Sequence, residues 1–292
     1  YKAIQGQKSQ LFLLDEIGLS SSVSQKLLSK NRVFDDQGNT LKNGQLLSCD
    51  YVQIAIFEGS TRGLKPIFET ADFAIFDKPS GVMVHPTRKT TAYCLLDEVR
   101  YHFGDKANLA HRIDTETSGL VLVGIHKQAN TLLKTMFEEK KYHKEYLALV
   151  KGRLDNQLSI EKPISKSTGS IAVKMSCDNK KGKHSTTHIY PLQFNENNNT
   201  TLVKAVPITG RQHQIRVHLD SVGHPIVGDP IYGVDEKTAG EYLEKTLSEE
   251  KRLELTGSSR LMLHANKLSF VYKGAKYEVL SKQESAMSFN YQ

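Results

Sequence analysis

The sequence is poor in several features that would assign it to a common class of protein. It has no tryptophan and only three cysteines in 292 residues. The cysteines are widely spaced and odd in number (Cys49, Cys94 and Cys177), so the sequence predicts neither a disulfide framework nor a zinc knuckle. No apolar run approaches the roughly 20 residues that span a bilayer, and residues 1–10 lack the apolar core of a secretory signal. We therefore expect a cytoplasmic chain in a reducing compartment, without a membrane partner.

The composition indicates a globular chain with a basic body. Hydrophobic residues make up 38% of the chain, enough for the core of one large domain, or of one large and one small domain. The net charge of +7 and the pI of about 9.1 indicate a polyanionic partner. Residues 1–58 hold six of the 39 basic and six of the 32 acidic residues, so the whole excess lies after residue 58.

Residues 111–124, HRIDTETSGLVLVG, change from polar to apolar. The apolar run Leu120–Val123 has the length of a buried strand, so Asp114 is expected in a loop at the mouth of a sheet. Arg112, two residues earlier, favours the ionised carboxylate and orients it. Such a carboxylate on an anchored loop is placed to attack an electron-poor carbon. In an arbitrary Arg-x-Asp sequence, however, a surface ion pair between Arg112 and Asp114 is the commoner arrangement.

The segment His-Arg-Ile-Asp-x-x-Thr-Ser-Gly, residues 111–119, resembles the active-site motif of the RluA-type family of pseudouridine synthases. That motif is usually written His-Arg-Leu-Asp-x-x-Thr-Ser-Gly, and Ile113 for Leu is an exchange of similar size. The resemblance implies an α+β fold, a mixed and mainly antiparallel sheet with flanking helices and loops, and activity without a cofactor or metal. The turn Lys78–Gly81 after the expected strand Phe73–Phe76 resembles the first family motif, which packs beside the catalytic loop.

Tyr146 lies in the expected strand Lys144–Val150. By its residue type alone, it would be a half-buried strand tyrosine with its hydroxyl in water. The strand resembles the family segment Lys-x-Tyr-x-Ala-x-Val, in which the tyrosine faces the target base. The resemblance implies that Tyr146 stacks on an extruded uracil and that its hydroxyl serves as a proton acceptor.

The segment TGRQHQIRVHLDSVG, residues 209–223, carries the third strong resemblance. Thr209 is expected to cap a helix that begins near Arg211 and that Gly223 ends. A basic surface helix is the alternative interpretation. In the family, the arginine after His-Gln-Ile/Leu pairs with the catalytic aspartate, which implies this role for Arg216 and makes Ile215 an apolar wall of the base pocket.

The remaining expected contacts are with RNA. Gly182-Lys183-x-x-x-Thr187 resembles the family segment Gly-Lys-x-Ala-x-Thr, and its lysine either is simply solvated or follows RNA phosphates. The sequence thus predicts three catalytic residues, Asp114, Tyr146 and Arg216, and no metal ligands. It predicts a set of substrate-binding residues: His111, Arg112, Lys183, Arg211 and Ile215.

Residues 1–58 resemble a small α/β S4 RNA-binding domain, followed by a linker at 59–66 and a catalytic domain at 67–292. Three positions depart from the S4 pattern: Ser21 stands where arginine is usual, Asn31 where glycine is usual, and Cys49 where the Gly-Asp turn would have glycine. Asn31 can adopt the left-handed conformation that glycine adopts. The missing arginine and the zero net charge argue against strong RNA binding by this part.

Two further segments bear on the architecture. Asn130–Lys141 has the apolar spacing of an amphipathic helix. Residues 235–258 are charged and helix-prone, and they look like an insertion to which the sequence assigns no function.

The reaction must run on side chains alone, because no nucleotide-binding loop or Ser–His–Asp arrangement accompanies these motifs. Pseudouridine formation fits: the N1–C1′ bond breaks, the uracil turns, and C5 is joined to the sugar. Bond breaking develops positive charge at the sugar carbon, which a carboxylate stabilises. Asp114 could attack C1′, attack C6 of the base or remove the 2′-proton, and the sequence leaves these three open. In each case the target base must leave its stack in the RNA. This costs the least free energy in loops whose bases are already unpaired.

Three alternatives remain beside a monomeric synthase acting on large-subunit ribosomal RNA. The same chemistry could act on transfer RNA. The chain could be a non-catalytic RNA-binding or ribosome-assembly factor on the same fold. A carboxylate-based glycoside hydrolase would need a second acid at the site, for which Glu116 is the nearest candidate.

Overall fold

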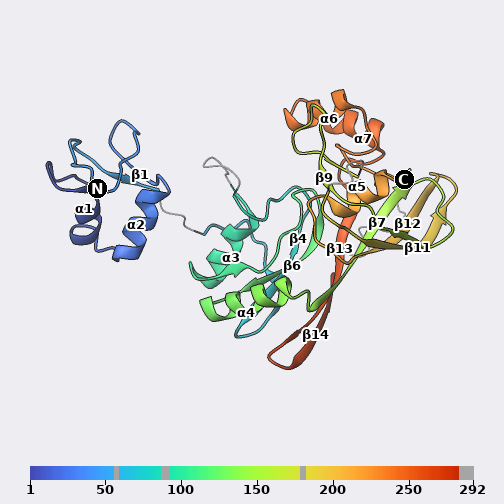
Figure 1. Ribbon diagram of the computed structural model, residues 1–292, viewed down its shortest axis with the longest axis horizontal. Helices are drawn as coiled ribbons and strands as arrows, with labels where there is room; N and C mark the ends of the chain where they lie inside the picture. Colours follow the sequence, from blue (N-terminus) through green and yellow to red (C-terminus); the bar gives the residue numbers. More distant parts are fainter. Residues whose placement is uncertain (56–58, 87–92, 178–181, 283–292) are drawn as a thin grey trace. The chain divides into compact units, whose positions relative to one another are not determined.

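The computed structural model describes residues 1–55, 59–86, 93–177 and 182–282 (Figure 1). The chain divides into two compact units, Tyr1–Glu58 and Gly59–Gln292. Its elements are, in chain order, α1 Ser9–Asp15, α2 Ser21–Ser29, β1 Val33–Phe34, β2 Gln53–Ile54, β3 Pro66–Glu69, β4 Phe73–Lys78, α3 Leu95–Phe103, β5 Asn108–Leu109, β6 Ser118–Gly124, α4 Lys127–Glu138, β7 Tyr142–Lys151, β8 Leu158–Ile160, β9 Ser165–Lys166, β10 Met175–Ser176, β11 Thr187–Asn195, β12 Thr200–Pro207, α5 Gln214–Asp220, α6 Glu236–Leu243, α7 Glu249–Thr256, β13 Leu263–Tyr272 and β14 Ala275–Leu280.

The first unit is a small α/β structure, as expected. The helices α1 and α2 and the antiparallel pair β1–β2 contribute to one apolar core, which includes Phe12, Leu28 and Val33. Asn31, directly after α2, has a φ of 52°, so the expected left-handed conformation is confirmed. Residues 59–66, expected as a linker, belong to the second unit, where a Cβ at Gly59 would overlap the backbone of α3.

The second unit is built on a ten-stranded sheet with the strand order β3-β4-β6-β13-β7-β12-β11-β8. The strand β14 pairs with β13, and β5 pairs with β6, beside this main path. The pairing of β6 with β13 is parallel, and the other pairings described in the sheet are antiparallel. The expected α+β class with a mixed, mainly antiparallel sheet is therefore confirmed.

Helix α4 covers the β4–β6–β13 part of this sheet with its apolar side. Leu133 and Met136 are buried against a cluster of sheet side chains that includes Phe73, Leu122 and Phe270. Each such side chain contributes about 1.5–3 kcal/mol when it leaves water. The helix begins three residues before the expected Asn130, because the imidazole of His126 accepts a hydrogen bond from the Ala129 N–H and caps it.

The glycine of the HRIDTETSG motif lies where two strand backbones approach closely. Gly119 is opposite Ala265 in the parallel β6–β13 pairing and has a φ of 109°. A Cβ at this position would overlap the backbone of Ala265. Only glycine combines this conformation with this spacing, so Gly119 anchors the strand that follows Asp114.

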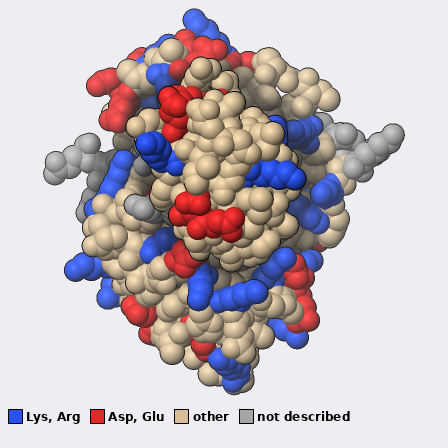
Figure 2. All heavy atoms as spheres, turned by 90° about the vertical axis from the view of Figure 1, so that its left-hand side faces the viewer, with Lys and Arg blue, Asp and Glu red and all other residues tan. Residues whose placement is uncertain are grey.

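The surface charges are mixed. On the face that Figure 2 shows, basic and acidic side chains are interspersed, and neither sign forms a continuous patch. Within the described stretches, no helix is long and apolar enough to cross a membrane.

We predict that Gly119→Ala destabilises the second unit by roughly 1–3 kcal/mol, because alanine must adopt a strained φ and push β13 away. Gly240 in α6 offers a matched control, since a Cβ there meets no neighbour within 4 Å and alanine favours helices. Urea unfolding followed by circular dichroism measures both variants. Equal midpoints for the two variants would contradict the close approach at Gly119.

Candidate active site

Asp114 lies in the loop between β5 and β6, and the turn after β4 holds this loop. The Nζ of Lys78 donates hydrogen bonds to the carbonyl oxygens of Pro79, Val82 and Thr115 at 2.7–2.9 Å. The Ser80 hydroxyl donates to the carbonyl oxygen of Glu116 at 2.6 Å. The Lys78–Gly81 turn thus packs beside the Asp114 loop, as its resemblance to the first motif implied.

The buried ammonium of Lys78 has a structural role. Burial lowers the pKa of Lys78 to about 7. Three carbonyl acceptors nevertheless match the three N–H groups of the protonated form, which a neutral amine could not supply. The lysine therefore fixes the backbone next to Asp114 and does not reach the reacting atoms.

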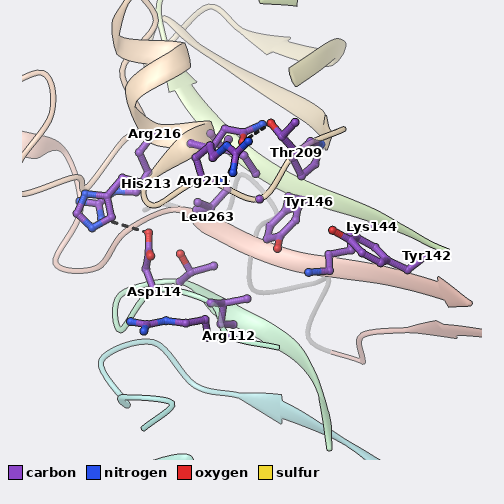
Figure 3. Close-up of a pocket in the computed structure, with 16 residues that line it drawn as sticks. Arg112, Asp114, Tyr142, Lys144, Tyr146, Thr209, Arg211, His213, Arg216 and Leu263 are labelled. Atoms are coloured by element: carbon purple, nitrogen blue, oxygen red, sulfur yellow. Dashed lines mark hydrogen bonds and ion pairs between the residues drawn. The ribbon is translucent and has the colours of Figure 1, made fainter. Parts of the chain in front are cut away.

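Arg216 links Asp114 to a second, fully buried carboxylate. Its Nε and Nη2 donate to the two oxygens of Asp229 at 2.7 and 2.8 Å, and its Nη1 lies 3.5 Å from Oδ2 of Asp114. The side chain of Arg216 is 3% exposed and that of Asp114 is 28% exposed. The carboxylate of Asp114 points toward Arg216 and away from Arg112 (Figure 3). Asp114 therefore pairs with Arg216 of α5, and not with Arg112 as the surface ion-pair interpretation would have it.

The contacts of Arg216 and Asp229 keep both buried groups charged. Burial alone would raise the pKa of Asp229, but Arg216 and the N–H groups of Ile231 and Tyr232 lower it overall. Burial acts to lower the pKa of Arg216, and Asp229 and then Asp114 raise it above its usual value. The guanidinium thus remains a cation, with one N–H directed at Asp114.

Helix α5 begins later than the sequence predicted. It starts at Gln214, after His213 with a left-handed φ of 54°, and not near Arg211. Thr209 does not cap it, because its hydroxyl donates to the Gln214 side chain at 2.6 Å and accepts from the N–H of Thr186. These side-chain bonds compete with a regular first turn, so the segment before α5 forms a tight turn at the pocket wall.

A pocket opens beside Asp114, between its loop, strand β7 and the start of α5 (Figure 3). It encloses a cavity of about 100 Å³, below the ~300–1,000 Å³ usual for small-molecule sites, and it opens to solvent. Alternate residues of β7 share one face, and Tyr142, Lys144 and Tyr146 all line the pocket. Burial and then the charge of Asp114 raise the pKa of Tyr146, so its hydroxyl stays protonated at neutral pH.

Lys144 lies beside two aromatic rings that contact each other, Phe137 and Tyr142. Its Nζ is 4.8 Å from the ring centres of both Phe137 and Tyr142. Burial lowers the pKa of Lys144 to about 7. The rings attract a cation but replace only part of its hydration, so the amine is placed to change charge near neutral pH.

Comparison with known sequences identifies the family. Residues 72–221 match the RNA pseudouridylate synthase family, which is half of the chain. The chain is also 37% identical over 284 residues to an uncharacterized RNA pseudouridine synthase of Helicobacter pylori, covering 96% of this chain and 94% of that protein. This chain belongs to the RluA-type RNA pseudouridine synthases.

Other relatives carry more specific names. Ribosomal large subunit pseudouridine synthase C of Haemophilus ducreyi is 31% identical, covering 91% of this chain and 84% of that protein. The mitochondrial tRNA pseudouridine(32) synthase of Saccharomyces cerevisiae is 33% identical, covering 69% of this chain and 44% of its own length. Among solved structures, human RNA Pseudouridylate Synthase Domain Containing 1 superposes with a TM-score of 0.62 at 25% identity, covering 80% of this chain and 89% of that one. The fold is that of pseudouridine synthases.

The synthase pocket brings together most of the residues that the sequence singled out. Asp114, Tyr146, Arg216, Arg112, Arg211 and Ile215 all line it. His111 is not among its lining residues; its Nε2 accepts from the N–H of Leu122 at 3.1 Å, and its ring lies against Phe137. Lys183 is exposed and lines an adjoining groove, which shares Gly210 and Arg211 with the pocket.

The structure adds residues to which the sequence assigned no role. Asp229 holds Arg216, and the ring of Tyr232 lies 5.1 Å from its guanidinium carbon. His213 and Lys144 line the pocket. The Gly-Asp-Pro turn at 228–230 signals a placed carboxylate, but nothing local indicates its partner on α5. In the described part of the chain, no group of three or more His, Cys, Asp or Glu side chains is arranged to hold a metal ion.

We predict that Lys144→Met stabilises the synthase most at acid pH. Below pH 7 the folded protein buries a charge, whereas between about pH 7 and the ordinary lysine pKa near 10.4 only the unfolded chain binds this proton. The free energy of unfolding of the wild type therefore rises with pH through this window. The stability gained by Lys144→Met becomes smaller over the same range. Thermal melts at pH 6 and pH 9 measure it, with the exposed Lys134→Met as control. An advantage that is the same at both pH values would contradict the lowered pKa.

Proposed function

We propose that this RNA pseudouridine synthase isomerises uridines of large-subunit ribosomal RNA, with Asp114 as the catalytic carboxylate. The observation that carries the proposal is the position of Asp114. It is partly exposed at a pocket, within 3.5 Å of a buried guanidinium that Asp229 holds in place. A carboxylate oriented in this way stabilises positive charge at the sugar carbon as the N1–C1′ bond breaks.

The pocket walls suit an extruded uracil. Tyr146 and Ile215 are buried, at 8% and 6% exposure, and Leu263 of β13 contributes a third apolar surface. A base stacked on the Tyr146 ring regains about 1–3 kcal/mol, comparable to the few kcal/mol lost when it leaves the RNA stack. Because the Tyr146 hydroxyl remains protonated, it can take up a proton only while it passes its own proton on, and otherwise it donates or accepts a hydrogen bond.

The groove next to the pocket suits the RNA backbone. Lys166, Lys183 and Arg211 line it, and Arg211 also lines the pocket. Cations on a continuous surface from the target base outward neutralise successive phosphates and hold the opened strand. Arg112 contributes at the pocket itself. His111 acts indirectly, by fixing the strand that follows the catalytic loop.

The choice of ribosomal RNA rests on the extent of the relationships. The ribosomal relative matches 91% of this chain, which is more than the second unit alone can supply. The transfer RNA relative matches 69%, which fits within the second unit. The similarity therefore extends into residues 1–58. We propose that this first unit is S4-like and helps to select ribosomal RNA.

The other interpretations have less support. A glycoside hydrolase would need Glu116 as a free second acid, yet both oxygens of Glu116 accept hydrogen bonds, from Tyr242 and Arg252. A non-catalytic factor would not need a carboxylate held by a buried guanidinium at a pocket.

We predict that Asp114→Asn lowers pseudouridine formation more than about 10³-fold, because the amide cannot supply the negative charge. RNA affinity and the thermal midpoint should stay close to wild type, since Asp229 still neutralises Arg216. Release of tritium from 5-tritiated uridine RNA measures the activity. Asp155→Asn, at an exposed ion pair with Arg153, is the control. Wild-type rates for Asp114→Asn would exclude the catalytic assignment.

The substrate can be identified by pseudouridine mapping of total RNA from cells with and without the gene, complemented by wild type or Asp114→Asn. We expect specific uridines of large-subunit ribosomal RNA to lose modification, and only the wild type to restore it. A loss confined to transfer RNA would exclude the ribosomal substrate and leave the chemistry intact.

A further inference from the structure

The segment of residues 235–258, which contains α6 and α7, contacts the loop that carries Asp114. Glu116, two residues after Asp114, accepts a hydrogen bond from the hydroxyl of Tyr242 on α6 at 2.9 Å. Its other oxygen accepts from Nη2 of Arg252 on α7 at 2.7 Å. The side chains of Glu116 and Arg252 are 13% and 12% exposed, so this ion pair is shielded from most solvent screening.

The same nitrogen of Arg252 also reaches the other half of the site. Nη2 donates to the carbonyl oxygen of Gly228 at 2.8 Å, and Gly228 precedes the Asp229 that holds Arg216. Gly228 has a φ of 77°, and a Cβ there would overlap the carbonyl oxygen of Arg260. The backbone at Gly228 therefore has little freedom. One nitrogen thus joins the Asp114 loop to the turn that supports Arg216.

The contact between Arg216 and Asp114 depends on the distance between the Asp114 loop and the turn that supports Arg216. The Arg216–Asp114 contact of 3.5 Å lies at the outer limit of a hydrogen bond, so a small shift of the loop would lose it. On its other side the loop is held by Lys78 and Ser80 through backbone carbonyl oxygens. The contacts of Glu116 hold it from the side of α6 and α7.

We propose that Glu116, Tyr242 and Arg252 are positioning residues of the pseudouridine synthase, through which the α6–α7 segment sets the distance between Asp114 and Arg216. This inference rests on the proposed catalytic role of Asp114. The three residues touch neither RNA nor the reacting atoms. They act by keeping the carboxylate where the sugar carbon of the target must arrive.

A second ion pair in the same segment provides a matched control. Lys251, next to Arg252, pairs with Glu241 of α6 at 2.6 Å. This pair joins α6 to α7 without contacting the Asp114 loop. A substitution at Lys251 therefore reports what the segment contributes to stability alone.

The test compares Arg252→Met, Arg252→Lys and Lys251→Met in steady-state assays on a uridine-containing RNA substrate. Arg252→Met should lower kcat about 10–100-fold with KM within about twofold, because a carboxylate misplaced by about 1 Å loses this much. Arg252→Lys should recover most of the rate, since one ammonium can donate to both Glu116 and Gly228. Lys251→Met should keep wild-type kcat.

Tyr242→Phe provides a second variant, which removes only the hydroxyl that donates to Glu116. It tests the positioning role even if Arg252→Met fails to fold. Its kcat should fall several-fold at unchanged KM. Glu116→Gln combined with Arg252→Met should cost no more than the worse single variant, because both break one connection.

Three results would overturn the proposal. The first is wild-type kcat for both Arg252→Met and Tyr242→Phe. The second is an equal loss for Arg252→Met and Lys251→Met, which would indicate general destabilisation. The third is a rise in KM with unchanged kcat, which would indicate an RNA contact. The Asp114→Asn variant, assayed in parallel, separates this failure from failure of the proposed function, because only the latter leaves Asp114→Asn active.

Discussion

The site depends on one buried cation. Removing a guanidinium from water costs several kcal/mol, and the structure offsets this cost by a bidentate pair between Arg216 and Asp229. Two backbone N–H groups complete the coordination of Asp229. Because this pair uses Nε and Nη2, the remaining Nη1 is available to Asp114. Lysine could not replace arginine here, since a single ammonium cannot span two carboxylates in this fixed planar geometry.

The Asp114 carboxylate, which we propose to be catalytic, is placed by the loop around it more than by its own contacts. Its ion pair with Arg216 is long, and more than a quarter of its side chain remains exposed. The neighbouring residues compensate. Thr115 and Glu116 are held through their backbone by Lys78 and Ser80, and Glu116 is held through its side chain from the α6–α7 segment. Rigid surroundings allow a weakly held carboxylate to keep a productive position.

Residues without side-chain chemistry are equally necessary to this arrangement. Gly119 lets β6 run parallel and close to β13 directly after the Asp114 loop, and Gly228 lets the turn that carries Asp229 pass a neighbouring backbone. The sheet therefore brings three distant segments together: the loop before β6, the face of β7 that carries Tyr146, and α5 with Arg216. The first unit has a net charge of zero, so the net positive charge of the chain lies in the second unit, which contains this pocket.

The sequence by itself predicted the family and the α+β class, because whole motifs resemble those of the family. The same motifs singled out Asp114, Tyr146 and Arg216, which line one pocket in the structure. The residue pattern also located α4 and the strands β4, β6 and β7. Tertiary structure alone decided that Asp229 holds Arg216, that Lys144 is buried beside two aromatic rings, and that residues 235–258 contact Glu116. It also placed the start of α5 at Gln214, after side-chain bonds of Thr209 that span distant segments. These features depend on contacts between residues far apart in the chain, which local patterns do not encode.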